Sequence, residues 1–242
     1  MPRSLNSMHP MRSFVTCACI ALAVCVTTTT VQAQLPSTRL TVVFPPGAKA
    51  GGEAEVVVSG VNFENVSRLF FSHPGISATQ KTVEPGPFDK GPQPVPNTFL
   101  VKVAANVPAG LHEIRAVGKY GASNPRAFQV SSLTESLEVD PNNKRAEATE
   151  LKLGTIVTGR SNAAADVDVF KFSATAGQRV LIDCWARRID SQLDAVIRVH
   201  DARGRELGSS RDAERRDPLV DFTAPATGEF FVTLHDSLYR GG

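Results

Sequence analysis

In Phe99-Leu100-Val101-Lys102-Val103 every second residue is bulky and apolar, so Phe99, Val101 and Val103 share one face of an extended chain. This period of two is typical of a β-strand with one face on a hydrophobic core. Similar short runs, rich in Val and Phe and bounded by Gly, Pro and Asn, lie on both sides of it. Between residues 38 and 131 we predict strands at Arg39–Phe44, Ala54–Gly60, Arg68–Phe71, Thr98–Ala104, His112–Val117 and Arg126–Val130.

The pattern of short strands continues in the C-terminal part of the chain. No segment has a sustained helical period, and 18 Gly and 16 Pro in 242 residues favour many turns. Here we predict strands at Thr155–Gly159, Val167–Ser173, Arg179–Trp185, Ala195–His200, Leu219–Thr223 and Glu229–Leu234. The sequence therefore predicts an all-β protein with two β-sandwich domains, the first Ig-like and the second jelly-roll-like.

The predicted domain boundaries follow the changes in composition. Residues 38–131 form the first sandwich, residues 132–153 a polar linker, and residues 154–242 the second sandwich. Pro141 would break any helix that starts in the linker. The stretch Val83–Pro96 holds five prolines and two glycines, so we expect an extended surface loop there.

Residues 1–33 have the three parts of a secretory signal peptide. Arg3, His9 and Arg12 make a basic start, and the apolar run Phe14–Val26 is too short to span a membrane. In Val31-Gln32-Ala33, small residues stand at the positions that a signal peptidase reads, so we predict cleavage after Ala33 and an exported protein. A lipoprotein anchored through Cys25 is the alternative, although the bulky Val24 precedes that cysteine.

Removal of the signal peptide changes the charge and the cysteine content. Loss of Arg3 and Arg12 lowers the number of Lys and Arg residues from 26 to 24, equal to the 24 Asp and Glu residues. A neutral chain lacks the basic footprint of nucleic-acid binding. Only Cys184 remains of four cysteines, which leaves no intrachain disulfide, and its apolar surroundings predict a buried strand thiol. No later segment is long and apolar enough for a membrane span.

Several motifs in residues 136–242 resemble the bacterial pre-peptidase C-terminal (PPC) domain, a secreted β-sandwich. They are Glu138-Val139-Asp140-Pro141-Asn142-Asn143, Asp166-Val167-Asp168-Val169-Phe170-Lys171-Phe172, Ala176-Gly177-Gln178-Arg179-Val180, Asp201-Ala202-Arg203-Gly204 and Ala224-Pro225-Ala226-Thr227-Gly228. That family continues into a further closing strand, so the resemblance implies a second sandwich truncated at its C-terminal strand. The first segment is similar to an IPT/TIG Ig-like domain through Val56-Val57-Val58-Ser59-Gly60 and Val61-Asn62-Phe63. This pairing resembles large secreted proteins of planctomycete-type bacteria.

Carboxylate and amide oxygens form the sharpest candidate site. Glu138, Asp140, Asn142 and Asn143 lie in the linker, and Asp166 and Asp168 begin a predicted strand. Ca²⁺ takes six to eight hard oxygen ligands, which two such groups supply together. The PPC resemblance implies calcium at these positions, although Ala165 stands where calcium-binding relatives carry a carboxylate. The alternative is a solvated acidic linker whose aspartates bond turn amides.

Catalytic motifs are missing from the sequence. No Gly-x-Ser-x-Gly, His-Glu-x-x-His or phosphate-binding glycine loop occurs, and His73, His112, His200 and His235 are scattered over different segments. We therefore predict a non-catalytic binding, adhesion or spacer module whose partner is an extracellular protein or a polysaccharide. The alternative is the accessory region of a secreted peptidase or other hydrolase whose catalytic domain lies outside this chain.

Overall fold

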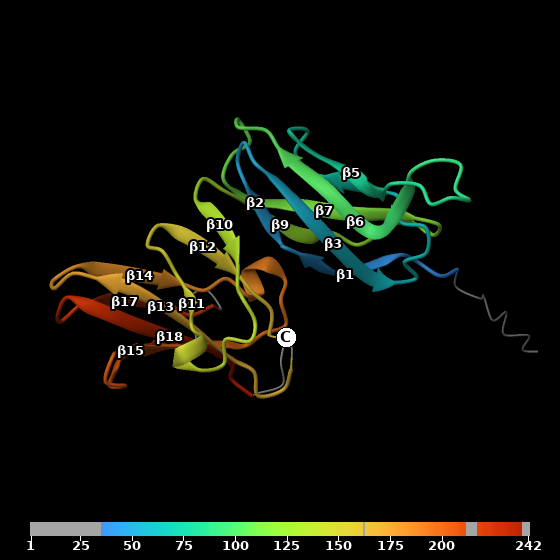
Figure 1. The fold of residues 1–242 in the computed structure, drawn as a ribbon. Coiled ribbons are helices and arrows are strands. Elements are labelled where there is room, and N and C mark those ends of the chain that lie inside the picture. The colour runs from blue at the N-terminus through green and yellow to red at the C-terminus, as the bar shows by residue number, and fades with distance from the viewer. Residues whose placement is uncertain (1–34, 162, 212–216, 239–242) are drawn as a thin grey trace, which may run out of the picture. The chain divides into compact units, whose positions relative to one another are not determined.

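The computed structural model describes residues 35–161, 163–211 and 217–238 (Figure 1). In these ranges every regular element is a strand except two 3-10 turns, η1 (Arg145–Glu147) and η2 (Arg187–Ile189). This confirms the predicted all-β class. The predicted signal peptide, residues 1–33, lies outside the described residues, so its cleavage after Ala33 stays a prediction.

The first nine strands, blue to green in Figure 1, form two sheets. One sheet is antiparallel with the order β1-β3-β6-β5, and the other has the order β2-β9-β7-β4 with β8 added to β7. The first sheet contains β1 (Arg39–Phe44), β3 (Glu53–Val61), β6 (Gln93–Val103) and β5 (Ile76–Val83). The second contains β2 (Gly47–Lys49), β9 (Arg126–Ser131), β7 (Gly110–Gly118), β4 (Arg68–Phe71) and β8 (Gly121–Ala122).

One hydrophobic core joins these two sheets into a sandwich. Phe99, Val101 and Val103 of β6 are all at most 3% exposed, as their alternation predicts. Phe128 of β9 faces them from the other sheet and meets the Phe71 ring edge-on at a centroid distance of 5.2 Å. Burial of these apolar side chains is the main force that holds the two sheets together.

The later strands, yellow to red in Figure 1, form a five-stranded sheet and two small sheets. The five-stranded sheet has the order β11-β13-β18-β15-β16. Its strands are β11 (Thr149–Glu150), β13 (Val167–Ala174), β18 (Gly228–Asp236), β15 (Ala195–Asp201) and β16 (Glu206–Ser210). The small sheets pair β14 (Arg179–Asp183) antiparallel with β17 (Leu219–Thr223), and β10 (Thr134–Leu137) parallel with β12 (Thr155–Thr158).

A second core lies between the five-stranded sheet and the β14–β17 pair. Its centre is a cluster of three aromatic rings, Phe172, Phe222 and Phe230, with centroids 5.4 to 6.0 Å apart. Phe172 comes from β13 and Phe230 from β18, whereas Phe222 comes from β17 across the sandwich. The alternation of β13 therefore turns its even-numbered residues toward this core.

The segment 132–153 is more structured than the predicted linker. It contains β10, η1 and β11, and both strands pair in parallel with later strands, β10 with β12 and β11 with β13. The polar composition that suggested a linker instead reflects very short strands with exposed faces. These strands bring residues 138–143 next to the start of β13.

The predicted loop Val83–Pro96 is shorter in the structure, because β5 extends to Val83 and β6 begins at Gln93. Pro94 and Pro96 lie inside β6, which is a correction to the sequence prediction. A proline removes a ladder donor, but β3 pairs with β6 only from Thr98 to Lys102, so both prolines lie beyond the doubly paired part.

Cys184 follows β14 instead of lying within it, because that strand ends at Asp183. The residue is partly buried, and burial raises the pKa of its thiol to about 12. The thiol therefore stays protonated near neutral pH, as expected for a non-nucleophilic cysteine. Within the described ranges, no helix has the length and apolar character needed to cross a membrane.

Candidate metal centre

Three carboxylates from distant parts of the sequence meet where β13 begins. Glu138, Asp140 and Asp168 each place one oxygen within 4.8 Å of the others. Glu138 is partly buried, Asp140 is exposed and Asp168 is buried. The sequence named all three as candidate ligands, and the structure brings them together.

The parallel pairing of β10 with β12 positions Glu138. The Glu138 N–H donates to the Thr158 carbonyl at 3.0 Å, which extends the β10–β12 ladder by one residue. The carboxylate then folds over Gly159, and Oε1 accepts a hydrogen bond from the Arg160 N–H. A Cβ on Gly159 would overlap this carboxylate, so only glycine leaves it room.

Gly159 and Arg160 are the residues of this site that sequence reasoning missed. A glycine at the end of a predicted strand is an ordinary turn signal. Its role depends on the pairing of β10 with β12, which no local pattern reveals.

Asn142 connects this segment to β13 through its backbone. Its carbonyl accepts the Val169 N–H at 3.0 Å, and its side-chain Nδ2 donates to Thr149 Oγ1 at 3.4 Å. The residue is fully buried, yet Oδ1 receives no hydrogen bond. A buried acceptor without a donor is costly, since the group has lost its water and gained nothing in return.

Asp168 lies on the core-facing side of β13, beyond the aromatic cluster. It is 2% exposed, and its Oδ1 also receives no hydrogen bond. Burial, and then the negative charges of Glu138, Asp166 and Asp140, raise the pKa of Asp168 to about 7. Burial likewise raises the pKa of Glu138, although the hydrogen bonds from Arg160 and Asn142 act in the opposite direction.

The remaining two candidates lie at the edge of the cluster. Asn143 Nδ2 donates to Asp166 Oδ1 at 3.0 Å, so these two side chains bond each other across the two segments. Ala165 adopts a left-handed conformation with φ of 64° just before them. It supplies no ligand, which agrees with the departure from the calcium pattern seen in the sequence.

The arrangement fits a hard cation. Glu138, Asp140, Asn142 and Asp168 offer carboxylate and amide oxygens. Among the described residues, three of these oxygens are buried without a hydrogen-bond donor: Glu138 Oε2, Asn142 Oδ1 and Asp168 Oδ1. Such oxygens are the ligands that Ca²⁺ takes, and none is a soft ligand such as sulfur or imidazole. A cation would satisfy the acceptors and remove the repulsion that raises the pKa of Asp168.

The histidines that the sequence left unpaired are partly brought together. His73 and His112 meet edge-on with ring centroids 5.6 Å apart. His73 Nδ1 accepts from the Gly75 N–H at 3.0 Å, and His112 Nε2 lies 2.9 Å from the Pro108 carbonyl. One nitrogen of each ring is thus engaged by the backbone, as is typical of structural histidines.

Both the fold and the acidic cluster define the C-terminal half as an all-β module with a candidate cation site at one end of its core. Residues 166–236 match the family described as the bacterial pre-peptidase C-terminal domain, so this part of the chain is a PPC domain. A probable subtilase-type serine protease of Deinococcus radiodurans is 33% identical over 101 residues. The match covers 39% of this chain and 14% of that protease.

Three solved structures are similar at low identity. A mixed-linkage glucan utilisation protein of Bacteroides ovatus in complex with a heptasaccharide is 12% identical, with 85% of this chain and 41% of that chain covered and a TM-score of 0.28. The adhesin InvE of Yersinia pseudotuberculosis is 12% identical, with 83% of this chain and 51% of that chain covered and a TM-score of 0.20. Domains A168–A170 of titin are 9% identical, with 85% of this chain and 93% of that chain covered and a TM-score of 0.19. At these TM-scores they carry no argument about function. The expected IPT/TIG likeness of the first segment and the planctomycete-type origin stay predictions.

Proposed function

We propose that this chain is an exported, non-catalytic accessory module whose PPC-containing part binds one Ca²⁺ ion. The observation that carries the metal proposal is the set of three buried acceptors without a donor, Glu138 Oε2, Asn142 Oδ1 and Asp168 Oδ1, beside the carboxylate of Asp140. Asn143 and Asp166, which bond each other at the edge of the cluster, would complete or support the ligand set.

Calcium suits this site better than magnesium. Mg²⁺ requires near-octahedral geometry and keeps several waters, whereas Ca²⁺ accepts irregular sets of carboxylate and amide oxygens. The ligands come from an irregular segment, 138–143, and from the beginning of a strand. Asp140 is exposed whereas Asp168 is buried, so water molecules would complete the coordination of the ion on the side of Asp140.

The ion would tie residues 138–143 to β13. Two hydrogen bonds already join these segments: the Val169 N–H donates to the Asn142 carbonyl, and Asn143 Nδ2 donates to Asp166 Oδ1. Bound calcium would add several ligand bonds across the same gap. We therefore expect it to stiffen this segment and to raise the stability of the second sandwich.

The accessory role is supported by the family match and by the protease relative. Both favour the alternative in which the chain serves a secreted peptidase whose catalytic domain lies outside these residues. The module would hold an extracellular protein or a polysaccharide near that enzyme. A fold match alone does not name the partner, so its identity follows from binding experiments and not from the family.

Export rests on the signal-peptide pattern of residues 1–33. Intact-mass measurement of the protein from the growth medium or periplasm tests it. Cleavage after Ala33 gives a mature chain that starts at Gln34, whereas a lipid-modified Cys25 at the N-terminus would contradict the proposed processing.

Thermal unfolding tests the calcium proposal. A ligand that binds only the folded state stabilises it by about 2.7 kcal/mol at a concentration one hundred times its Kd. We expect millimolar Ca²⁺ to raise the Tm of the chain above its value in excess chelator, and Mg²⁺ at the same concentration to raise it less. Identical Tm values in Ca²⁺ and chelator would refute the proposal.

A further inference from the structure

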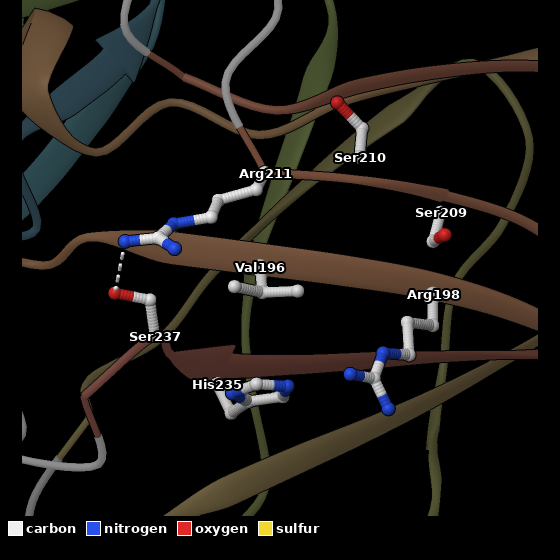
Figure 2. Close-up of a pocket in the computed structure, with 7 residues that line it drawn as sticks. All are labelled: Val196, Arg198, Ser209, Ser210, Arg211, His235 and Ser237. Carbon is white, nitrogen blue, oxygen red and sulfur yellow. Dashed lines mark hydrogen bonds between the residues drawn. The ribbon is translucent and has the colours of Figure 1, made fainter.

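A second polar site lies on the face of the five-stranded sheet that points away from the core. A hollow of about 380 Å³ is lined by Val196, Arg198, Ser209, Ser210, Arg211, His235 and Ser237 (Figure 2). Two of these residues are arginines, three are serines and none is an acid. The volume is at the lower end of the roughly 300–1,000 Å³ range of small-molecule sites.

Strand register builds the floor and the walls of this hollow. Val196 of β15 pairs with His235 of β18, and both are buried. Arg198, two residues farther along β15, lies on the same face and has Thr233 and Ser209 as its cross-strand neighbours. Neither neighbour carries a charge, and within the described residues Arg198 makes no ion pair.

Arg211 is fixed on the other side of the floor. Its Nη2 donates to Asp194 Oδ2 at 2.9 Å and to Ser237 Oγ at 3.1 Å. Figure 2 shows Arg211 and Arg198 on two sides of Val196 and His235. These two hydrogen bonds hold the guanidinium, which carries five N–H donors, at the edge of the hollow.

The acidic groups near the hollow are engaged elsewhere. Asp194 uses Oδ1 for Arg187 at 2.9 Å and Oδ2 for Arg211 and Ser237. Asp236 accepts the backbone N–H groups of Asp194 and Leu238, each at 3.1 Å. Within the described residues, Asp194 and Asp236 therefore already have partners, and Arg198 is left without an ion pair beside the hollow.

The charge of Arg198 also acts on a neighbouring histidine. His200 lies on this face of β15, two residues beyond Arg198. Burial, and then the positive charges of Arg145 and Arg198, lower the pKa of His200. The negative charges of Glu206 and Asp201 act in the opposite direction.

We propose that this hollow binds an oxyanion, a sulfate or phosphate group, carried on a small polar molecule of about the size of a monosaccharide. Arg198 and Arg211 supply charged N–H donors and Ser209 a hydroxyl, which is the donor set that oxyanions take. Among the described residues that line the hollow, Val196 alone is apolar, so the carrier is polar. This site is separate from the proposed calcium site and does not depend on it.

Calorimetric titration of the full chain tests the proposal. The ligands are inorganic sulfate, inorganic phosphate, glucose 6-sulfate, glucose 6-phosphate and uncharged glucose, in excess chelator and at constant ionic strength set with chloride. We expect the anionic ligands to bind and glucose to give no heat. Tighter binding of the sugar esters than of the inorganic ions identifies the carrier as part of the ligand, whereas equal binding identifies the free ion.

Arg198→Gln is the decisive variant, because Arg198 is exposed and makes no ion pair within the described residues. We expect it to weaken anion binding at least about tenfold, the effect of losing one charge-assisted hydrogen bond. Arg203→Gln, an exposed arginine in the turn after β15, is the matched control and should bind as the wild type does. Absence of binding by the wild type, or equal binding by both variants, would overturn the proposal.

Discussion

Asp168 is the residue on which the metal proposal depends most. It is 2% exposed, it has an oxygen without a hydrogen bond, and two other carboxylates lie within 4.8 Å. Without a cation, its ionised form is unfavourable because burial and the neighbouring charges both act against it, as the rise of its pKa to about 7 reflects. One substitution can therefore separate the effect of the charge from the effect of the ion.

Asp168→Asn should raise the Tm in excess chelator, because it removes a buried negative charge while it keeps the shape of the side chain. The same variant should lose the increase in Tm that Ca²⁺ gives the wild type. Glu229→Gln is the control, since Glu229 is an exposed acid of the same sandwich. If Asp168→Asn kept the full calcium response, Asp168 would not be a ligand.

Asp217 is the opposite case, a buried carboxylate with many donors. Its oxygens accept the backbone N–H groups of Arg187 and Arg188 at 2.8 and 3.0 Å and the Arg188 Nε at 3.0 Å. Burial alone would raise its pKa, but these hydrogen bonds prevail and the pKa lies below its usual value. The ionised group therefore stabilises the folded state.

Asp217→Asn should lower the free energy of unfolding by about 3 kcal/mol, because it leaves Arg188 without its buried charged partner. The pH dependence follows from the lowered pKa. The contribution of Asp217 is complete above the unfolded pKa near 4 and is lost as the pH falls toward the folded value. Urea unfolding of both proteins from pH 7 to pH 2 measures this: the difference between them should shrink in acid, and a constant difference would contradict the assigned role.

At the level of elements, the parallel β10–β12 pair positions Glu138 over Gly159. Gly159→Ala places a methyl group where this carboxylate lies, so Glu138 has to move away from the cluster. We expect a weaker calcium response with little loss of stability, because the displaced group is the end of a flexible side chain. The calcium response is measured as the increase in Tm that Ca²⁺ gives Gly159→Ala, compared with the increase it gives the wild type.

Gly228→Ala provides the matched control for this element. Gly228 begins β18, and a Cβ there meets no atom within 4 Å. Both substitutions add one methyl group at a strand end of the same sandwich. Equal calcium responses in the two variants would show that Glu138 does not need the space over Gly159.

Strands that carry their own alternation were predictable from the sequence. β1, β4 and β17 have the predicted bounds, and the buried face of β6 is the predicted one. The missed strands, such as β5 and β16, are polar or glycine-containing edge strands whose hydrogen bonds come from a neighbour. For example, β16 has the sequence Glu-Leu-Gly-Ser-Ser and exists because it pairs with β15.

The candidate metal site was predictable only in part, because some of its features depend on strand pairing. The oxygen-bearing residues stand out in the sequence, and the PPC resemblance suggested that the segments 138–143 and 166–168 meet. The space over Gly159 and the buried acceptor of Asn142 depend on strand pairing and burial. Neither follows from residue type, since asparagine is usually exposed.

At the level of the whole molecule, two separate hydrophobic cores predict two unfolding units. Phe99 is fully buried in the first core, and Phe172 is 3% exposed in the second. Truncation of either ring should cost about 3–5 kcal/mol. Scanning calorimetry of Phe99→Ala and Phe172→Ala should therefore lower different transitions, and Ca²⁺ should raise only the transition that Phe172→Ala lowers.

A single transition that responds to both variants and to Ca²⁺ would contradict the two-domain division at residues 132–153. It would mean that the segment with β10 and β11 couples the two cores. The domain boundary would then describe the sequence composition and not the folding units.

Calcium binding measured by isothermal titration calorimetry tests the central claim most directly. The full chain, freed of metal with chelator and then dialysed, is titrated with Ca²⁺, alongside Asp168→Asn and the control Glu229→Gln. We predict one ion per chain for the wild type and for Glu229→Gln, and a binding heat that disappears in Asp168→Asn. No binding by the wild type at millimolar Ca²⁺, or binding that survives in Asp168→Asn, would contradict a calcium site in this cluster.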